Sequence, residues 1–253
     1  MSFLNVTQVG NYSERQCRYG LMRWITNDVG VGRSLALYAE WSESEVMLWR
    51  GFIRPSDVVI SAGANIGAHL IPLSKMAKHV YSAEPNPLLA DLTVHNLRTN
   101  NIENVTLAVG AFSEKKGHGF IKSTPPDRND SNYGGCTLVE QGRGDLQIPT
   151  MPIDEFGLME CAMIHLDVEG HELLALKGAA DTIKRCKPIL YVECDRERNN
   201  PELFSWIRNH DYQIALHMAR LYNEQNYAEY MDDIFGPMSS AMALCIPDRG
   251  WQK

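Results

Sequence analysis

The sequence predicts one α/β domain with a mostly parallel sheet, helices on both faces and an antiparallel strand at the C-terminal end. Apolar strand-like runs alternate with helical spacing from residue 57 to residue 209, which is typical of parallel strands joined by right-handed crossovers. These strands are apolar almost throughout, as expected where both sheet faces are buried. Two more strand-like runs, 212–217 and 241–246, are joined by a polar and aromatic stretch without a helical stripe, which favours an antiparallel finish.

Each element is placed by the spacing of its apolar residues. The predicted helix at 66–77, for example, carries Ile66, Leu70, Leu73 and Ala77 on one side. The predicted strands are 57–61, 79–83, 105–109, 161–166 and 189–192. The predicted helices are 66–77, 88–97, 173–183 and 201–209.

The predicted domain organisation is an N-terminal extension at 1–50, followed by the main domain at 51–253. Within the extension, Ser42 followed by Glu45 fits a capping box that would begin a helix. We find no internal repeat and no low-complexity tract.

Composition limits the classes of partner. The chain has 253 residues, is 44% hydrophobic and 22% charged, and carries a formal net charge of −7, so nucleic acid and anionic membrane are not expected as partners. The first residues lack the pattern of a signal peptide, and no apolar run reaches the ~18 residues that span a bilayer. A cytoplasmic protein is therefore expected, and the sequence is compatible with a homo-oligomer. The six cysteines are irregularly spaced, which favours buried thiols over a zinc site or a redox pair.

The segment 58–67 has the pattern of a strand, a glycine turn and the beginning of a helix. Gly63 can adopt a positive φ and lets a ligand approach the backbone, and N–H groups near the helix start can bind anionic or polar ligand atoms. Asn65 stands where the G-x-G-x-x-G pattern has its middle glycine, which disfavours a dinucleotide pyrophosphate site. The alternative interpretation is a tight strand-to-helix connection without a ligand.

Glu84 ends the next predicted strand. A carboxylate at this place can accept hydrogen bonds from both ribose hydroxyls of a nucleoside cofactor. The alternative is that Glu84 or Asn86 is a charge or cap near the positive end of the following helix. Because Glu84 follows the Gly63 turn, we favour the ribose role.

Acidic and histidine side chains gather where the fourth predicted strand ends. Strand alternation puts His165 and Asp167 on one face, at the strand ends where such sheets bind ligands. Glu169 follows directly, and Glu193 ends the fifth predicted strand and is expected either in the same crevice or as a helix cap. His171 is expected to be a solvated residue at a helix start.

Three motifs in this order resemble the FkbM family of S-adenosylmethionine-dependent methyltransferases. They are Gly-Ala-Asn-Ile-Gly at 63–67, Ala-Glu-Pro-Asn-Pro at 83–87 and Asp-Val-Glu-Gly-His-Glu at 167–172. Segments at 38–42, 176–179 and 188–193 resemble the family as well, so the resemblance spans roughly 27–195. It implies a Rossmann-like class I methyltransferase fold. It also implies O-methylation of a hydroxyl of a sugar, glycan or secondary metabolite, with S-adenosylmethionine as the cofactor and no metal.

The sequence departs from the family pattern at three positions. The family usually has Asp where this chain has Ser61, and Lys where it has His165. That aspartate normally helps to organise the cofactor site, so cofactor affinity is expected to differ. His165 would take the lysine's place with a different pKa. Ala39 replaces a usual glycine.

The expected site combines these motifs. In-line methyl transfer needs the acceptor oxygen held ~3–3.5 Å from the methyl carbon, and a positioned base typically adds ~10²–10⁴-fold. His165 and Asp167 are the candidate bases, with Glu169 and Glu193 orienting the acceptor. The expected cofactor-binding residues are Gly63, Ala64, Asn65, Gly67, Glu84 and Asn86, with Gly110 or Ala111 beside the adenine.

Two other functions are compatible with the residues. A nicotinamide-dependent oxidoreductase fits the Gly63 turn and Glu84, although the missing G-x-G-x-x-G and the antiparallel finish disfavour it. A non-catalytic binding protein that keeps the methyltransferase fold would explain Ser61 and His165.

Two long stretches, 113–150 and 218–239, interrupt the main domain, and such insertions are usually functional loops. The first contains the turn-rich segment 132–135, and the second contains several aromatic residues among Asn and Asp. We expect both to cover the acceptor crevice and exclude water. The alternative is that the aromatics of 218–239 pack the loop onto the core.

Overall fold

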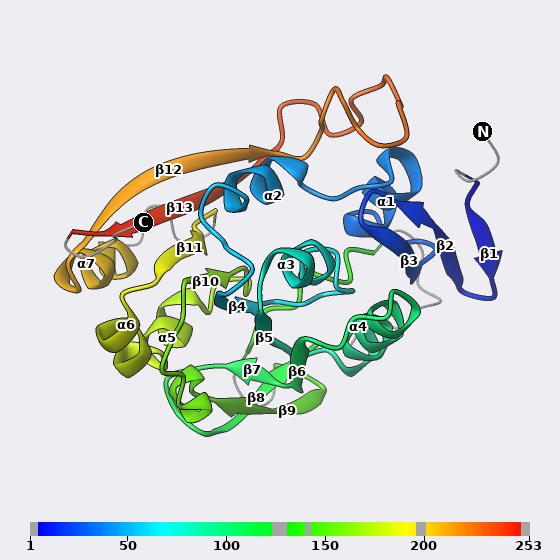
Figure 1. Ribbon diagram of the computed structural model, residues 1–253. Helices are drawn as coiled ribbons and strands as arrows, with labels where there is room; N and C mark the ends of the chain where they lie inside the picture. Colours follow the sequence, from blue (N-terminus) through cyan, green and yellow to red (C-terminus); the bar gives the residue numbers. More distant parts are fainter. Residues whose placement is uncertain (1–4, 123–130, 140–142, 196–200, 249–253) are drawn as a thin grey trace.

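A seven-stranded sheet forms the centre of the computed structural model, which describes residues 5–122, 131–139, 143–195 and 201–248. Its strands are β4 (Val58–Ala62), β5 (His79–Glu84), β6 (Val105–Val109), β10 (Met163–Leu166), β11 (Ile189–Glu193), β12 (Tyr212–Arg220) and β13 (Ser239–Pro247). They lie in the order β12-β13-β11-β10-β4-β5-β6 (Figure 1). The five strands from β11 to β6 are parallel, whereas β13 is antiparallel to both β11 and β12. This arrangement confirms the predicted fold class.

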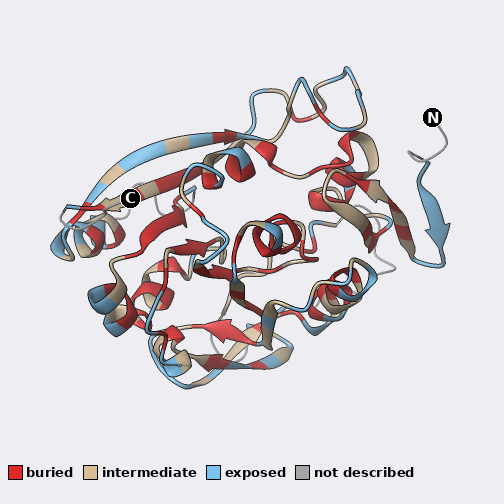
Figure 2. Ribbon diagram, viewed as in Figure 1, coloured by how far each residue is buried: buried red, intermediate tan, exposed pale blue. Residues whose placement is uncertain are grey.

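Helices cover both faces of this sheet, and each face has its own apolar core. Helices α1 (Val31–Tyr38), α2 (Glu43–Trp49), α3 (Leu70–Met76) and α4 (Pro87–Thr99) contribute to one core. Helices α5 (Glu172–Lys177), α6 (Ala180–Cys186) and α7 (Pro201–Asn209) contribute to the other. In the coloured ribbon, buried residues follow the central strands and the inner sides of these helices (Figure 2).

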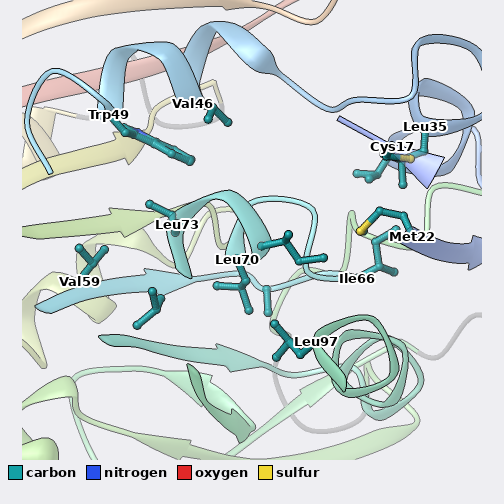
Figure 3. Close-up of a cluster of buried hydrophobic side chains, with 14 of the residues drawn as sticks. Cys17, Met22, Leu35, Val46, Trp49, Val59, Ile66, Leu70, Leu73 and Leu97 are labelled. Carbon is teal, nitrogen blue, oxygen red and sulfur yellow. The ribbon is translucent and has the colours of Figure 1, made fainter. Parts of the chain in front are cut away.

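Strand alternation distributes the central residues between the two cores as predicted. Val59 and Met163 belong to the first core, while Ile60 and Ile164 belong to the second. Figure 3 shows the first core, where Trp49 of α2 lies above side chains of α3 and β4. The first core therefore joins α1 and α2 of the N-terminal extension to the central sheet, whose strands lead into the motifs.

The N-terminal extension contains a three-stranded antiparallel sheet that the sequence did not predict. Its strands are β1 (Thr7–Val9), β2 (Tyr12–Cys17) and β3 (Gly20–Ile25). Asn96 of α4 and its C-cap residue Asn100 hold β3, since Asn96 Oδ1 accepts the Arg23 N–H at 2.8 Å and Asn100 Oδ1 accepts the Leu21 N–H at 2.9 Å. This sheet therefore lies beside α4 (Figure 1).

A second small sheet lies within the predicted interruption at 113–150 and at its edges. Its strands are β7 (Ala111–Phe112), β8 (Gly117–Ile121) and β9 (Leu146–Met151), in the order β7-β9-β8. The 3₁₀ helix η2 (Ile153–Phe156) leads from it towards β10. The interruption is therefore partly a folded structure and not only a loop.

Two predicted helices differ from the structure. The helix expected at 66–77 begins at Leu70, because the preceding residues form the turn of the first motif. The helix expected at 173–183 is split into α5 and α6 around Gly178. A Cβ at Gly178 would lie 2.0 Å from the Ser113 carbonyl oxygen. The helix is therefore interrupted where two backbone segments approach each other closely, and the spacing of apolar residues does not reveal such a contact.

The predicted capping box at the start of α2 also differs. Ser42 is the N-cap residue as expected, but its φ is 41° and its side chain makes no cap hydrogen bond. The Ser42 Oγ instead donates to Glu45 Oε1 at 2.6 Å. Both residues are buried, so their side chains bond to each other in the interior. Within the described parts of the chain, no helix is both long and apolar enough to cross a membrane.

Candidate active site

The turn after β4 has the backbone geometry that its glycines suggest. Gly63 has φ +81° and Gly67 has φ +86°, and Asn65 between them has φ +51°, a conformation that asparagine tolerates better than most residues. A Cβ at Gly63 would lie 1.9 Å from the Asp167 carbonyl oxygen. The turn thus brings the first and third motifs into direct contact, and only glycine fits at this position.

Glu84 connects this turn to the second motif. Its side chain is buried, its Oε2 accepts the Asn65 N–H at 2.7 Å, and its Oε1 accepts the Asn86 N–H at 2.9 Å. Burial, together with the nearby charge of Asp167, raises the pKa of Glu84 to about 7. Asn86 itself is the N-cap of α4 and accepts the Leu88 N–H at 3.1 Å. Asn86 is therefore the cap that the alternative interpretation expected, whereas the ribose role of Glu84 stays a prediction.

A cavity with two lobes lies along the carboxyl ends of the central strands. The larger lobe has a volume of about 190 Å³ and the smaller about 30 Å³. Residues from all three motifs and from the segment after 130 line both lobes: Gly63, Glu84, Gly134, Asp167 and Glu169. The motifs therefore enclose one continuous site, with Glu84 where the lobes meet.

Most of the predicted cofactor residues line this cavity. Ala64 and Asn65 face the larger lobe, and Gly110 and Ala111 face the smaller one. Gly67 and Asn86 line neither lobe: Gly67 shapes the turn through its positive φ, and the side chain of Asn86 caps α4. The Asn65 Oδ1 is buried without a hydrogen-bond partner among the described residues, which suits a ligand that donates a hydrogen bond.

Three further carboxylates reach the larger lobe, as predicted for Asp167, Glu169 and Glu193. Burial and the mutual repulsion of these acids raise the pKa of both Asp167 and Glu193, and the two side chains share a hydrogen bond. Both carboxyl groups therefore keep their protons to higher pH than exposed acids do. In the described part of the chain, no three His, Cys, Asp or Glu side chains are arranged to hold a metal ion.

The structure separates His165 from these acids. Its ring is fully buried behind the cavity wall, packed against Trp49 at a centroid distance of 5.0 Å and Tyr191 at 5.9 Å. Its Nδ1 lies 2.9 Å from Ser61 Oγ, and burial lowers its pKa well below the usual value. His165 is absent from the residues that line the cavity. Its predicted role as a base beside the acceptor therefore has no geometric support.

Several residues of the larger lobe were not predicted from the sequence. They are Gly30, Trp41, His69 and Ser240. Trp41 lies in a segment that resembles the family, and this was a usable signal. His69 was hidden inside a predicted helix, and Ser240 comes from β13, which only the fold brings to this edge.

The two interruptions behave differently. Asn132 and Gly134 of the first line the larger lobe, and Cys136 and Leu138 line the smaller one. In the second, 218–239, no described residue lines either lobe. Its rings pack on Tyr38 of α1: Tyr222, Tyr230 and Phe235 lie at centroid distances of 5.3, 6.0 and 5.9 Å. The expectation that 218–239 covers the crevice is therefore wrong, because its aromatics anchor it to the N-terminal extension.

Comparison with known proteins identifies the family. Residues 61–214, more than half of the chain, match the methyltransferase FkbM domain family. The structure resembles the FkbM methyltransferase of Methylobacillus flagellatus KT with a TM-score of 0.52 and 21% identity, over 79% of this chain and 50% of that one. It also resembles an rRNA methylase from Streptococcus thermophilus with a TM-score of 0.51 and 10% identity, over 81% and 95% of the two chains. At these identities the likeness concerns the fold.

Shorter sequence matches point to the same class of enzyme. A protein-L-isoaspartate O-methyltransferase of Protochlamydia amoebophila is 40% identical over 65 residues, or 26% of this chain and 31% of that protein. A probable cobalt-precorrin-6B C(15)-methyltransferase of Methanococcus maripaludis is 36% identical over 56 residues, 22% and 31% of the two chains. The chain thus spans about a third of the length of these curated relatives. The protein belongs to the FkbM methyltransferases, S-adenosylmethionine-dependent enzymes with a Rossmann-like class I fold.

Proposed function

We propose that the protein transfers the methyl group of S-adenosylmethionine to a hydroxyl oxygen of an uncharged small molecule, such as a sugar, a glycan or a secondary metabolite. The charge of the cavity carries this proposal. Four carboxylates line the larger lobe, and no lysine or arginine is among the described residues that line either lobe. Carboxylates accept hydrogen bonds from hydroxyl groups and repel phosphates, which disfavours nucleic acid as the acceptor.

The residues of the two lobes fit the methyl donor. Glu84 would accept hydrogen bonds from the ribose hydroxyls where the lobes meet, and Ala111 and Phe112 would flank the adenine in the smaller lobe. Asp167 and Glu169 would face the positive sulfonium, whose charge offsets the repulsion between the acids. When bound, the donor supplies the methyl group.

Asp167 and Glu193 would orient the acceptor. They share a hydrogen bond and line the larger lobe, so the pair would both accept a hydrogen bond from an acceptor hydroxyl and donate one to it. Holding that oxygen in line with the methyl carbon is the main contribution that such a site makes to the rate. Trp41 and Asn132 close the same lobe against water.

The test is incubation with methyl-labelled S-adenosylmethionine and matched acceptors. Uncharged glycans and polyols are compared with nucleotide sugars and with RNA. We expect label on hydroxyl oxygens of uncharged acceptors and much less on their phosphorylated counterparts. Label found mainly on RNA would overturn the proposed acceptor class, and no transfer to any acceptor would favour a binding protein that keeps the fold.

A further inference from the structure

His69 is a histidine of the larger lobe that none of the motifs includes. It directly precedes α3, is 8% exposed and lines the cavity together with Asp167 and Glu193. We propose that His69 is the general base that takes the proton of the acceptor hydroxyl, and that Glu45 of α2 positions it. This proposal rests on the proposed function and adds a catalytic residue to it.

Glu45 and His69 form a buried pair from two different helices. Glu45 Oε1 lies 3.9 Å from His69 Nε2 and also accepts a hydrogen bond from Ser42 Oγ at 2.6 Å. The His69 ring packs against Trp49 with a centroid distance of 4.9 Å and an interplanar angle of 76°. Ser42 and Trp49 thus hold the two members of the pair in place.

The pair has unused hydrogen-bonding capacity. Among the described residues, His69 Nε2 and Glu45 Oε2 are buried without a hydrogen-bond partner. Leaving such an atom unpaired costs about 1–3 kcal/mol, so native proteins rarely keep one without a reason. A 3.9 Å gap between carboxylate and imidazole closes to a hydrogen bond with a small side-chain movement, and a charged imidazolium would favour that movement.

The other polar groups of the lobe suit different roles. Asp167 and Glu193 share a hydrogen bond with each other, which suits them to orient the acceptor hydroxyl. His165 lies behind the wall. His69 is the remaining imidazole on the wall of this lobe, and in its neutral form it has a lone pair for an acceptor proton.

Burial shifts the pKa of each group away from its ordinary value. Burial raises the pKa of Glu45 to about 8 and lowers that of His69 to about 3. Below about pH 8 the pair therefore holds one acidic proton, and above it the pair is a carboxylate beside a neutral imidazole, ready to accept one. The titratable groups that face the pair from neighbouring elements are His165, Asp167, Tyr191 and Asp195.

In the proposed transfer, the O–H bond of the acceptor breaks and its proton passes to His69. The new O–C bond forms as the C–S bond of the donor breaks, which leaves a methyl ether, S-adenosylhomocysteine and an imidazolium at His69. The carboxylate of Glu45 stabilises that imidazolium until the proton leaves to solvent.

Kinetics of two variants test these roles on an uncharged acceptor identified in the labelling experiment. His69→Gln should lower kcat by ~10²–10⁴-fold while the affinity for S-adenosylhomocysteine stays within about threefold, because the proton acceptor is lost and the donor site is not. In the unaltered protein, kcat should rise near pH 8 as Glu45 ionises. Glu45→Gln should lower kcat less than His69→Gln does and should remove this rise. His118→Gln, an exposed histidine of β8, is the control and should change neither. A kcat for His69→Gln within threefold of the unaltered protein would overturn the proposal.

Nuclear magnetic resonance of ¹⁵N-labelled histidine tests the pair without any acceptor. In the S-adenosylhomocysteine complex, the His69 ring signals should shift near pH 8 as Glu45 ionises, and Glu45→Gln should abolish this shift. Absence of the shift in the unaltered protein would refute the proposed interaction of Glu45 with His69, even if the protein methylates hydroxyls. Its presence, with no hydroxyl methylated in the labelling experiment, would retain the pair and refute the proposed acceptor class.

Discussion

Ser61 Oγ lies 2.9 Å from His165 Nδ1, so the two residues that depart from the family pattern on adjacent strands are hydrogen-bonded to each other. Parallel pairing of β4 with β10 places them directly opposite. The family usually has aspartate and lysine at these positions, a charge pair that this chain replaces with a neutral pair. The two departures are therefore one matched exchange in the core and do not by themselves imply a loss of activity.

A double-mutant cycle tests this matched exchange. Ser61→Asp or His165→Lys alone should lower the free energy of unfolding by about 3–5 kcal/mol, because each buries an unpaired charge. The double variant should recover part of this loss, with a coupling energy of about 0.5–3 kcal/mol. Urea unfolding of the four proteins measures it, and additive losses would show that the two positions are independent.

Gly63 provides a test of the turn. Gly63→Ala should destabilise the protein and abolish binding of S-adenosylhomocysteine, because its Cβ would lie 1.9 Å from the Asp167 carbonyl oxygen. Gly157→Ala is the matched control, since Gly157 has φ +58° with nothing within 4 Å of the added Cβ. The free energy of unfolding of the control should fall only by the ~1–2 kcal/mol that a left-handed backbone conformation costs an alanine. Equal effects on stability and binding would mean that the close approach at Gly63 is unimportant.

Glu84 provides a test of the ribose site. Glu84→Gln should weaken the binding of S-adenosylhomocysteine by roughly 5- to 150-fold, which corresponds to about 1–3 kcal/mol for hydrogen bonds lost in a buried site. Asp91→Asn, an exposed acid of α4, is the control and should bind normally. Calorimetric titration measures both, and unchanged affinity in the Glu84 variant would remove this residue from the site.

The buried acids and histidines predict how stability depends on pH. The pKa of Glu84 is raised to about 7 and that of Glu45 to about 8, so the folded protein holds extra protons from about pH 4 upwards, and stability should fall as pH rises towards 8. The pKa values of His69 and His165 are lowered, so the unfolded protein holds the extra protons there, and stability should rise with pH up to about pH 6.5.

Urea unfolding across pH should therefore show a broad maximum between about pH 4.5 and 6.5, where the glutamate and histidine effects oppose each other. Replacing both Glu45 and Glu84 by glutamine should make the decline above the maximum shallower and the rise on the acidic side steeper, because the glutamate effect already begins on the acidic side. A decline of unchanged steepness would assign it to other groups, such as Asp167 and Glu193.

The strand ends were predictable from the sequence because local patterns encode them. Gly63, Glu84 and Asp167 each follow an apolar strand, and parallel strands bring their carboxyl ends to one edge. The wall opposite these motifs was not predictable in this way. Ser240 reaches the lobe only because β13 pairs with β11, and Glu45 approaches His69 only through packing of α2 on α3.

The remaining differences have equally local physical causes. The split of the helix at 173–183 follows from the contact of Gly178 with the backbone of Ser113, a pairing that no periodicity reveals. Alternation correctly placed His165 on the face of β10 opposite Ile164, but it did not show that Trp49 and Tyr191 bury the ring away from the cavity. Strand periodicity predicts a face of the sheet, whereas exposure depends on what packs against that face.

The central claim is that the two lobes hold the methyl donor with its ribose at Glu84 and its sulfur beside His69 and Asp167. A crystal structure with S-adenosylhomocysteine tests it most directly. We predict ribose hydroxyls within hydrogen-bonding distance of the Glu84 carboxylate, adenine beside Ala111 and Phe112, and the sulfur in the larger lobe. Density for the nucleoside outside these lobes, or a ribose that makes no contact with Glu84, would contradict the account.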